Sequence, residues 1–396
     1  MARKKSVFRS ADLEQLKHLV YKRYNKKITR SVDCEHLSKA VAKVTKQALS
    51  PHSIRRFLGY LKSDFSTSIN TLNILASYAG YDNWEAFRQD IPSIGFQALD
   101  LEQESELYLD FYKIEMKTEA DMNYHNASRN IAFRILFNPR LLKNIESRLA
   151  ENPVSQIFFF ERFPFIDGLN TDYKKSLQLY LQKEGAEAQI FGNSLLFLSA
   201  FLCRRNKELK KYYDRISQIP INNTMHPFTI ARYIGSIYLY KHVQSEDVST
   251  CLTEINNWNK FFLQKRNINF WNYPYYQHMV AGYLNLTKNF KESFEIIKTQ
   301  VLFIKPYEIE KGYEEALEVI SEIARSSYSS FSYQTWFNST KVFDSINPLF
   351  KKYYQIKCLC IYYSHLPPGK RREKVSEMVT ELIDETGFTY FTNYLS

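Results

Sequence analysis

Glycine and proline are scarce in this chain, with 11 and 12 copies among 396 residues. Glycine supplies the positive φ angles that tight turns and phosphate-binding loops need, so its scarcity argues against a β-sandwich and a nucleotide-binding α/β fold. Apolar residues make up 44% of the chain and aromatic residues 16%. The composition therefore predicts an all-α fold with aromatic-rich cores and short polar loops.

Cysteine is also rare. Five scattered residues form no disulfide framework, and we expect reduced thiols in the cytoplasm: Cys34, Cys203, Cys251, Cys358 and Cys360. No second Cys/His pair stands at metal-ligand spacing from the last two, so these predict buried structural thiols. The N-terminal residues lack the apolar segment of a signal peptide, and the longest apolar run, 194–203, is too short to span a bilayer. We expect no metal, no cofactor and no membrane partner.

Most of the chain carries no net charge. The first 60 residues hold 15 Lys and Arg against 4 Asp and Glu, a balance of +11, and the remaining residues hold 38 of each sign. We call residues 1–92 the head and residues 99–396 the body, because Pro92 and Gly95 mark a boundary within 91–98. A cationic head on an electroneutral body indicates that the head binds a polyanion.

The head contains a candidate recognition helix over 51–61. Ser50 is a natural N-cap and Pro51 suits the first helical position. With Ile54 at the centre of the buried stripe, the opposite face carries His52 and Arg56, flanked by neighbouring polar side chains. This arrangement gives an apolar back that docks on the preceding helix, predicted over 35–45, and a cationic front that can reach base edges or phosphates.

Ten head residues are therefore candidate DNA-binding residues. Four on the third helix are placed to meet base edges, and three on the preceding helix and turn to hold phosphates: His52, Ser53, Arg55 and Arg56, then Lys39, Lys43 and Lys46. Arg3, Lys4 and Lys5 either enter a neighbouring groove as an arm or form a solvated tail. Gly59 either lets the helix backbone approach a duplex closely or ends the helix.

Two stretches of the head also resemble a known module. The segment 36–59 contains Leu49-Ser50 and Ile54-Arg55-Arg56-Phe57-Leu58-Gly59, and 68–87 contains Thr71-Leu72, Leu75-Ala76, Tyr78, Gly80-Tyr81, Trp84 and Phe87. These motifs resemble an N-terminal helix-turn-helix-like module of many Bacteroidetes-type bacterial proteins. The resemblance implies binding to DNA or to a partner. The turn 45–50 is longer than the tight glycine turn of ordinary repressors, which implies a different angle for the recognition helix.

In the body, the sequence pattern predicts one helix after another, including single helices over 122–149 and 331–345. One stretch resembles a degenerate tetratricopeptide repeat, with Gln277 where that repeat has tryptophan, and matches at Val280-Ala281, Leu284, Phe290, Ser293 and Ile297. The predicted fold is thus a helix-turn-helix-like domain followed by an antiparallel, tetratricopeptide-like or α-solenoid array.

No catalytic pattern emerges from the sequence. A glycine-rich phosphate loop, His-Glu-x-x-His and Gly-x-Ser-x-Gly are all missing. The leading hypothesis is a cytoplasmic DNA-binding protein, a transcriptional regulator whose body binds a peptide ligand or a protein partner, or forms a homo-oligomer. The alternative is a helical adaptor whose head binds a protein or RNA. A third hypothesis is an enzyme with an unrecognised motif.

Overall fold

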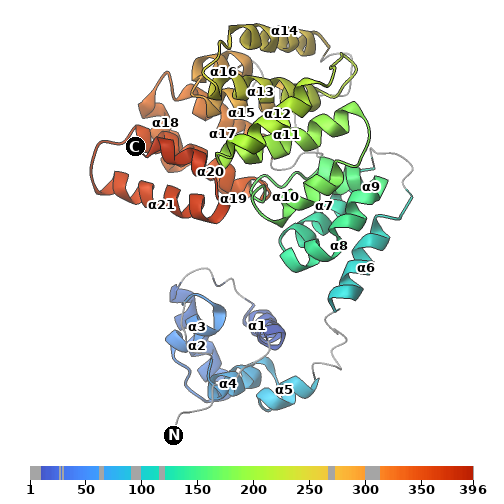
Figure 1. Cartoon of the computed structure of the whole chain (residues 1–396). Coiled ribbons are helices and arrows are strands. Elements are labelled where there is room, and N and C mark those ends of the chain that lie inside the picture. Colours follow the sequence, from blue (N-terminus) through green and yellow to red (C-terminus); the bar gives the residue numbers. More distant parts are fainter. Residues whose placement is uncertain are drawn as a thin grey trace. The chain divides into compact units, whose positions relative to one another are not determined.

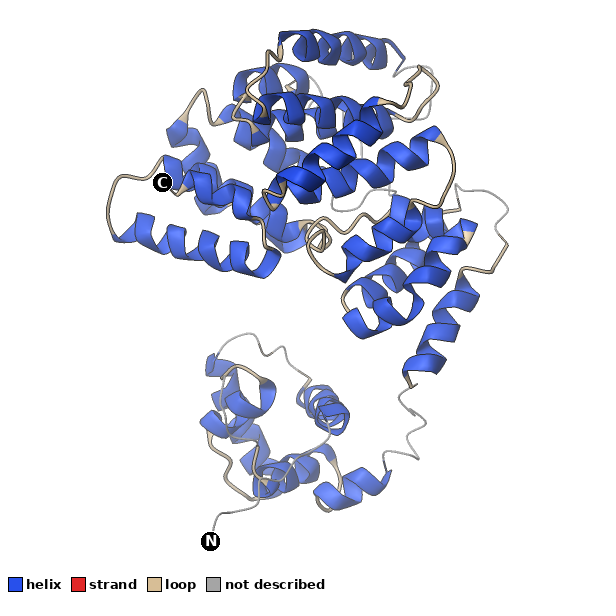
Figure 2. Ribbon diagram, viewed as in Figure 1, coloured by secondary structure: helices blue, strands red, loops and turns tan. Residues whose placement is uncertain are grey.

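The computed structural model describes residues 10–25, 28, 31–61, 67–90, 100–115, 121–265, 273–298 and 313–395. Within these ranges the chain forms helices joined by short connections and contains no strand, which confirms the all-α class (Figure 1, Figure 2). The chain divides into two compact units, Met1–Gln103 and Glu104–Ser396. The boundary predicted within 91–98 lies outside the described residues, which stop at residue 90 and resume at residue 100.

The N-terminal unit packs five helices around one apolar core. They are α1 (Ser10–Tyr24), α2 (Ser31–Thr45), α3 (Pro51–Leu58), α4 (Ile69–Ala79) and α5 (Trp84–Asp90). Helix α4 contacts α1, α2 and α5, and α3 packs on α2. The core side chains follow helical spacing, so each helix buries one stripe: Leu16, Val20, Leu37, Val41, Ile54, Phe57, Leu72, Leu75, Trp84 and Phe87.

The second unit contains the remaining helices, of which α6 begins just before its first residue. In chain order they are α6 (Leu101–Phe111), α7 (Met122–Leu136), α8 (Pro139–Glu151), α9 (Pro153–Ser155), η2 (Gln156–Glu161), α10 (Asp172–Tyr180), α11 (Ala186–Leu202), α12 (Asn206–Ser217), α13 (Pro227–Val243), α14 (Ser249–Lys265), α15 (Tyr275–Leu286), α16 (Phe290–Ile297), α17 (Tyr313–Arg325), α18 (Ser330–Ser339), α19 (Val342–Ser345), α20 (Lys351–Ser364), α21 (Lys370–Thr386) and η4 (Thr389–Tyr394).

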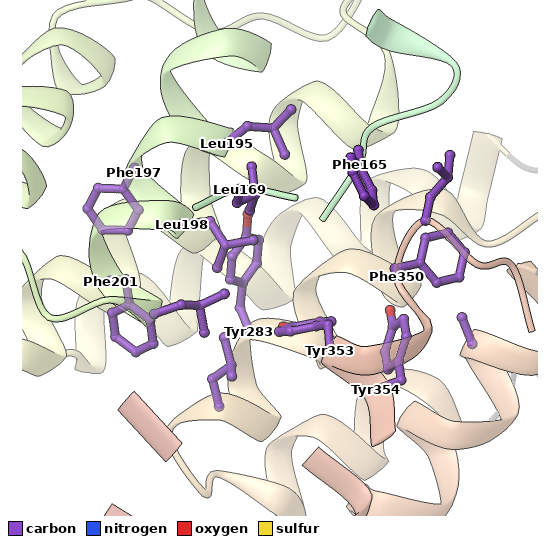
Figure 3. Packing of buried hydrophobic residues seen from close by; sticks show 14 of the residues in the cluster. Phe165, Leu169, Leu195, Phe197, Leu198, Phe201, Tyr283, Phe350, Tyr353 and Tyr354 are labelled. Atoms are coloured by element: carbon purple, nitrogen blue, oxygen red, sulfur yellow. The ribbon is translucent and has the colours of Figure 1, made fainter. Parts of the chain in front are cut away.

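These helices share one continuous core. Helix α11 packs on α12 and α13, α13 on α15, α15 on α16 and α17, and α17 on α20. The final turn, η4, packs on α20 and returns to α11. Aromatic side chains fill much of this core, as Phe197, Phe201 and Tyr353 illustrate (Figure 3). The apolar run 194–203 is buried in α11 as far as Leu202, and Cys203, which follows as the C-cap residue, is half-buried. Among the described helices, none has both the length and the apolar character needed to cross a membrane.

A buried carboxylate links the middle of the chain to α20. The Asp167 carboxylate accepts hydrogen bonds from the backbone N–H groups of Lys352 and Tyr353, both at 2.8 Å, and so satisfies two free donors at the start of that helix. Burial raises the pKa of Asp167 to about 6, and the two N–H donors oppose that rise. The start of α20 is therefore fixed by a residue far away in the sequence.

Three predicted helix boundaries are wrong. The single helix expected over 122–149 is two helices, because Pro139 begins α8 and the Asn138 side chain caps it by accepting from the Leu141 N–H. The helix expected over 331–345 is interrupted at Thr340, whose backbone is extended with ψ 142°. The recognition helix ends at Leu58 instead of residue 61, because Gly59 takes a left-handed conformation with φ 86°.

The π-helix η2 is an element that the sequence analysis missed. Its residues Phe158, Phe159 and Phe160 are all fully buried. Three consecutive buried aromatics give neither the helical nor the strand periodicity on which such predictions depend. The wider π turn carries this run through the core, between α7, α8 and α10.

Candidate nucleic-acid interface

Helix α3 has the two faces that the sequence predicts. Ile54 and Phe57 are buried against the rest of the head, whereas His52 is exposed. Leu58 and Leu61, expected in the same buried stripe, are half-buried. The helix is held at both ends, since the Ser50 side chain accepts from the Ser53 N–H at 3.0 Å and the Gly59 N–H donates to the Arg55 and Arg56 carbonyls. The apolar back and the two caps fix which side chains face outward.

The connection between α2 and α3 folds back along α2. Lys46 begins it with a positive φ of 58°, and the Thr45 hydroxyl receives the N–H of Gln47 at 3.2 Å. The Ser38 hydroxyl then donates to the Leu49 carbonyl, so the end of the connection lies beside the middle of α2. This path differs from a tight glycine turn, in keeping with the longer turn noted in the sequence. It brings α3 alongside α2 and sets which α2 residues can reach its cations.

The two arginines of α3 have different surroundings. The Arg55 Nη2 atom lies 3.1 Å from a carboxylate oxygen of Glu35 on α2, and the two side chains are 27% and 51% exposed. Arg56 is half-buried and makes no ion pair within 4 Å to any described residue. Its Nε atom is shielded from water and has no hydrogen-bond partner among those residues. Arg56 is therefore the α3 cation whose charge is uncompensated, while Arg55 shares its charge with Glu35.

The other candidate residues divide into three groups. Lys39, Lys43 and Lys46 are all exposed, and the first two stand one turn apart on α2. Ser53 is half-buried and its hydroxyl lies 3.0 Å from the Ser50 hydroxyl, so it takes part in the N-cap. The proposed arm, Arg3, Lys4 and Lys5, lies outside the described residues. The structure thus places four exposed cationic or titratable side chains on α2, its turn and the start of α3: Lys39, Lys43, Lys46 and His52.

Gly59 ends α3, and its position leaves room for a larger partner. Its φ of 86° is one that residues with a Cβ adopt only under strain. A Cβ built there meets no atom within 4 Å. The helix-ending role is therefore observed, and close approach by a duplex backbone is sterically open at the same place.

Two features of the head were missed at the sequence level. Glu35 lies 20 residues from Arg55, and nothing in the local pattern marks it as the partner of that arginine. Tyr60, 45% exposed, donates its hydroxyl to the Ile28 carbonyl at 2.7 Å. The Tyr60 ring beside α3 is thus held in place by the Ile28 carbonyl. Aromatic side chains next to cations are common where proteins contact nucleic acid.

The part of the body that the structure describes contains no cluster of side chains suited to hold a metal ion. A search for three or more neighbouring His, Cys, Asp or Glu side chains suited to a metal ion finds none among the described residues. Cys358 and Cys360 are buried free thiols, as predicted, and burial raises the pKa of Cys358 to about 12. A protonated buried thiol is a poor nucleophile and a poor metal ligand.

Comparison with known proteins adds no relative. The sequence matches no protein-family model, no curated protein and no solved structure. The surface chemistry of the head and the buried groups of the body are therefore the features that bear on function.

Proposed function

We propose that this protein is a DNA-binding transcriptional regulator. Its head would act as a helix-turn-helix-like domain that contacts duplex DNA with α2 and α3. Its body would act as a tetratricopeptide-like or α-solenoid array that binds a ligand or a partner, or self-associates. The observation that carries this proposal is the confinement of the whole net charge to the first 60 residues, which include an α3 with an apolar back and a cationic front.

The geometry of α2 and α3 supports a division of roles. Lys39 and Lys43 on α2 and Lys46 in the connection suit phosphate contacts, which position a protein on a duplex without reading its sequence. Arg56 suits base edges, because a guanidinium can donate two parallel hydrogen bonds to guanine. Arg55 adds a second contact, either by exchanging Glu35 for the DNA or while it stays paired with Glu35.

The test is duplex binding by the full-length protein as a function of salt. Fluorescence anisotropy with a 30-base-pair duplex at 50–300 mM NaCl is expected to give a slope of log K against log salt of about −4, because roughly five cations displace counterions. Single-stranded RNA of equal length serves as the competing probe. No duplex binding at 50 mM salt contradicts the proposal, and tighter RNA binding favours the adaptor hypothesis.

A protein partner for the head is the second candidate, and it has its own supporting observation. Val32 and Val44 on α2 are 55% and 45% exposed, on the helix that also carries the lysines. Both valines leave apolar surface exposed to water. Contact with another protein would bury that surface. Retention of partner binding by a head that does not bind nucleic acid would distinguish the adaptor.

Neutralising Glu35 is expected to strengthen duplex binding. Glu35→Gln removes a negative charge from the proposed interface and takes away one partner of Arg55, so affinity at 100 mM salt should rise about two- to fivefold. The matched control is Glu14→Gln on α1, which breaks the Glu14–Lys17 ion pair of 2.7 Å elsewhere in the head. A fall in affinity specific to Glu35→Gln would show instead that the ion pair orients Arg55 for binding.

A further inference from the structure

The body contains a small, partly open cavity with a volume of about 50 Å³. Its walls come from α11, α13, α15, the start of α17, the start of α20 with the preceding Phe350, and the segment with Pro164 and Ile166. Figure 3 shows Leu198, Tyr283, Phe350, Tyr353 and Tyr354 gathered at this place from helices far apart in the sequence. Most of the lining is apolar or aromatic. The guanidinium of Arg232 and the imidazole of His278 also line the cavity.

Arg232 is a buried cation without a compensating anion. Its side chain on α13 is 4% exposed, and no described carboxylate lies within 4 Å of it. Its Nη1 atom is shielded from water and makes no hydrogen bond to a described residue, and its guanidinium lies 5.3 Å from the Phe191 ring centroid. Burial of a charge is costly unless hydrogen bonds and an opposite charge accompany it. The arrangement therefore leaves room for an anionic hydrogen-bond acceptor.

A second unsatisfied donor lies beside this guanidinium. The Tyr283 hydroxyl is buried and makes no hydrogen bond of good geometry to a described residue. The nearby Arg232 and Ser236 side chains lower the pKa of Tyr283, against a larger rise that burial causes. Tyr283 is held there by close packing on Gly235 of α13, where an added Cβ would lie 2.1 Å from the ring. Two buried donors, one of them charged, thus belong to the same cavity.

Lys357 adds a second buried cation behind the cavity wall. Its side chain on α20 is 4% exposed, and its Nζ donates to the carbonyl of Gly282, a lining residue, at 3.3 Å. The ammonium lies 4.9 Å and 5.4 Å from the ring centroids of Tyr353 and Tyr354. Among the described residues no carboxylate pairs with it. The permanent positive charge at the cavity is therefore that of Arg232, and Lys357 adds to it only while its ammonium group is protonated.

His278 forms a polar but neutral part of the wall. Its Nε2 lies 3.3 Å from the Tyr354 hydroxyl, and its Nδ1 is hydrogen-bonded to the Tyr273 hydroxyl, which donates to the Tyr313 carbonyl at 3.0 Å. These contacts fit a neutral ring whose Nδ1–H donates to Tyr273 and whose Nε2 accepts from Tyr354. Burial, Lys357 and Arg232 lower the pKa of His278 to about 3. The imidazole therefore contributes no charge near neutral pH.

The size of the cavity limits its occupant. One water molecule needs about 10–15 Å³ of such a cavity. A volume of about 50 Å³ therefore accommodates a group of roughly three to five non-hydrogen atoms. Ile166, Leu198 and Met279 add apolar side chains to its lining. A single fixed guanidinium charge matches a monoanion, and its planar fork matches the two oxygens of a carboxylate.

We propose that this cavity binds a small aliphatic monocarboxylate, whose oxygens accept hydrogen bonds from Arg232 and Tyr283 and whose alkyl group contacts the apolar wall. The inference rests on the proposed role of the body as the ligand-binding part. It does not depend on DNA binding by the head, so each proposal can fail alone.

The test uses the full-length protein with propionate as the probe. Sodium propionate at 20 mM, replacing NaCl at constant ionic strength, is expected to raise the Tm by at least about 2 °C and to give a saturable heat of binding in calorimetry. Propionamide, which has the same shape without the charge, should leave the Tm unchanged. Equal shifts with propionate and inorganic phosphate would overturn the assignment to a carboxylate.

Two variants locate the site. Arg232→Gln and Tyr283→Phe are each expected to weaken propionate binding at least tenfold, and Arg215→Gln, at an exposed arginine of α12, should leave it unchanged. If Arg232→Gln does not fold, Tyr283→Phe provides the test of the site, because it removes only one oxygen atom and should leave the fold intact. No propionate binding by the unaltered protein, or undiminished binding by the variants that fold, overturns the proposal.

Discussion

Replacing both Arg55 and Arg56 by alanine should lower the duplex-DNA affinity of the full-length protein about 100-fold or more at 100 mM salt. Each well-placed arginine contact to a base contributes about 1–3 kcal/mol, and loss of both also removes two counterion-releasing charges. Helix α3 should remain intact, because Ile54 and Phe57 hold its buried face and alanine is a good helix former. The measurement is anisotropy against salt, with circular dichroism to confirm the fold.

A matched control separates local contacts from overall charge. Lys207→Ala with Lys211→Ala removes two exposed charges from α12 of the body and should change affinity less than threefold. Arg55→Lys with Arg56→Lys keeps the charge but loses the planar fork, so it should retain binding to random sequence while losing discrimination between sequences. An alanine double variant that binds as tightly as the unaltered protein would show that α3 does not form the interface.

Replacing Lys357 by methionine should stabilise the body by about 2–5 kcal/mol at pH 6. Lys357 is buried among aromatic rings, and burial lowers its pKa from 10.5 to about 7. At about 1.4 kcal/mol for each pKa unit, this shift corresponds to a cost of at most about 5 kcal/mol for holding the charge inside. Methionine has similar length and needs no hydration, so it removes that cost. Urea unfolding at fixed pH measures the gain.

The gain should shrink as pH rises. Below pH 7 lysine is protonated in both the folded and unfolded chain, so the full cost applies. Between about pH 7 and 10.5 the unfolded chain binds the proton and the folded chain does not, so the unaltered protein gains stability with pH. Near pH 10 the two proteins should differ by about 1 kcal/mol or less. Lys352→Met, at an exposed position on α20, is the control and should show no such pH dependence. A constant difference across pH would mean that the pKa of Lys357 is the same in the folded and the unfolded chain, so that burial does not lower it.

Local signals in the sequence were sufficient for most helices. Ser50 with Pro51 marks the start of α3, and Gly80 the end of α4, because caps and left-handed glycines act within a few residues. The same kind of signal, Asn138-Pro139, was present inside the region predicted as one helix and correctly marks a break. The π-helix η2 could not be found this way, since its buried aromatics follow no amphipathic period.

The surroundings of the candidate sites could not be predicted, because they depend on contacts between distant residues. The sequence identified Arg55 as a cation of α3, but only the folding back of α3 along α2 shows that Glu35 shares its charge. In the body, a lysine inside the apolar stretch of α20 was a visible anomaly. Its position near Arg232, on a helix more than a hundred residues earlier, follows only from the packing of α13, α15 and α20 around one cavity.

The hydrogen bonds from Lys352 and Tyr353 to Asp167 have a consequence for how the chain is made. Lys352 follows Asp167 by 185 residues, so this carboxylate leaves the ribosome long before its partners are synthesised. At about 5–20 residues per second, the delay is roughly 10–40 s. During that time the segment around Asp167 lacks α20 and the aromatic side chains that pack with it. The body is therefore expected to complete folding late in synthesis, and nascent chains that stop before α20 should be held by chaperones.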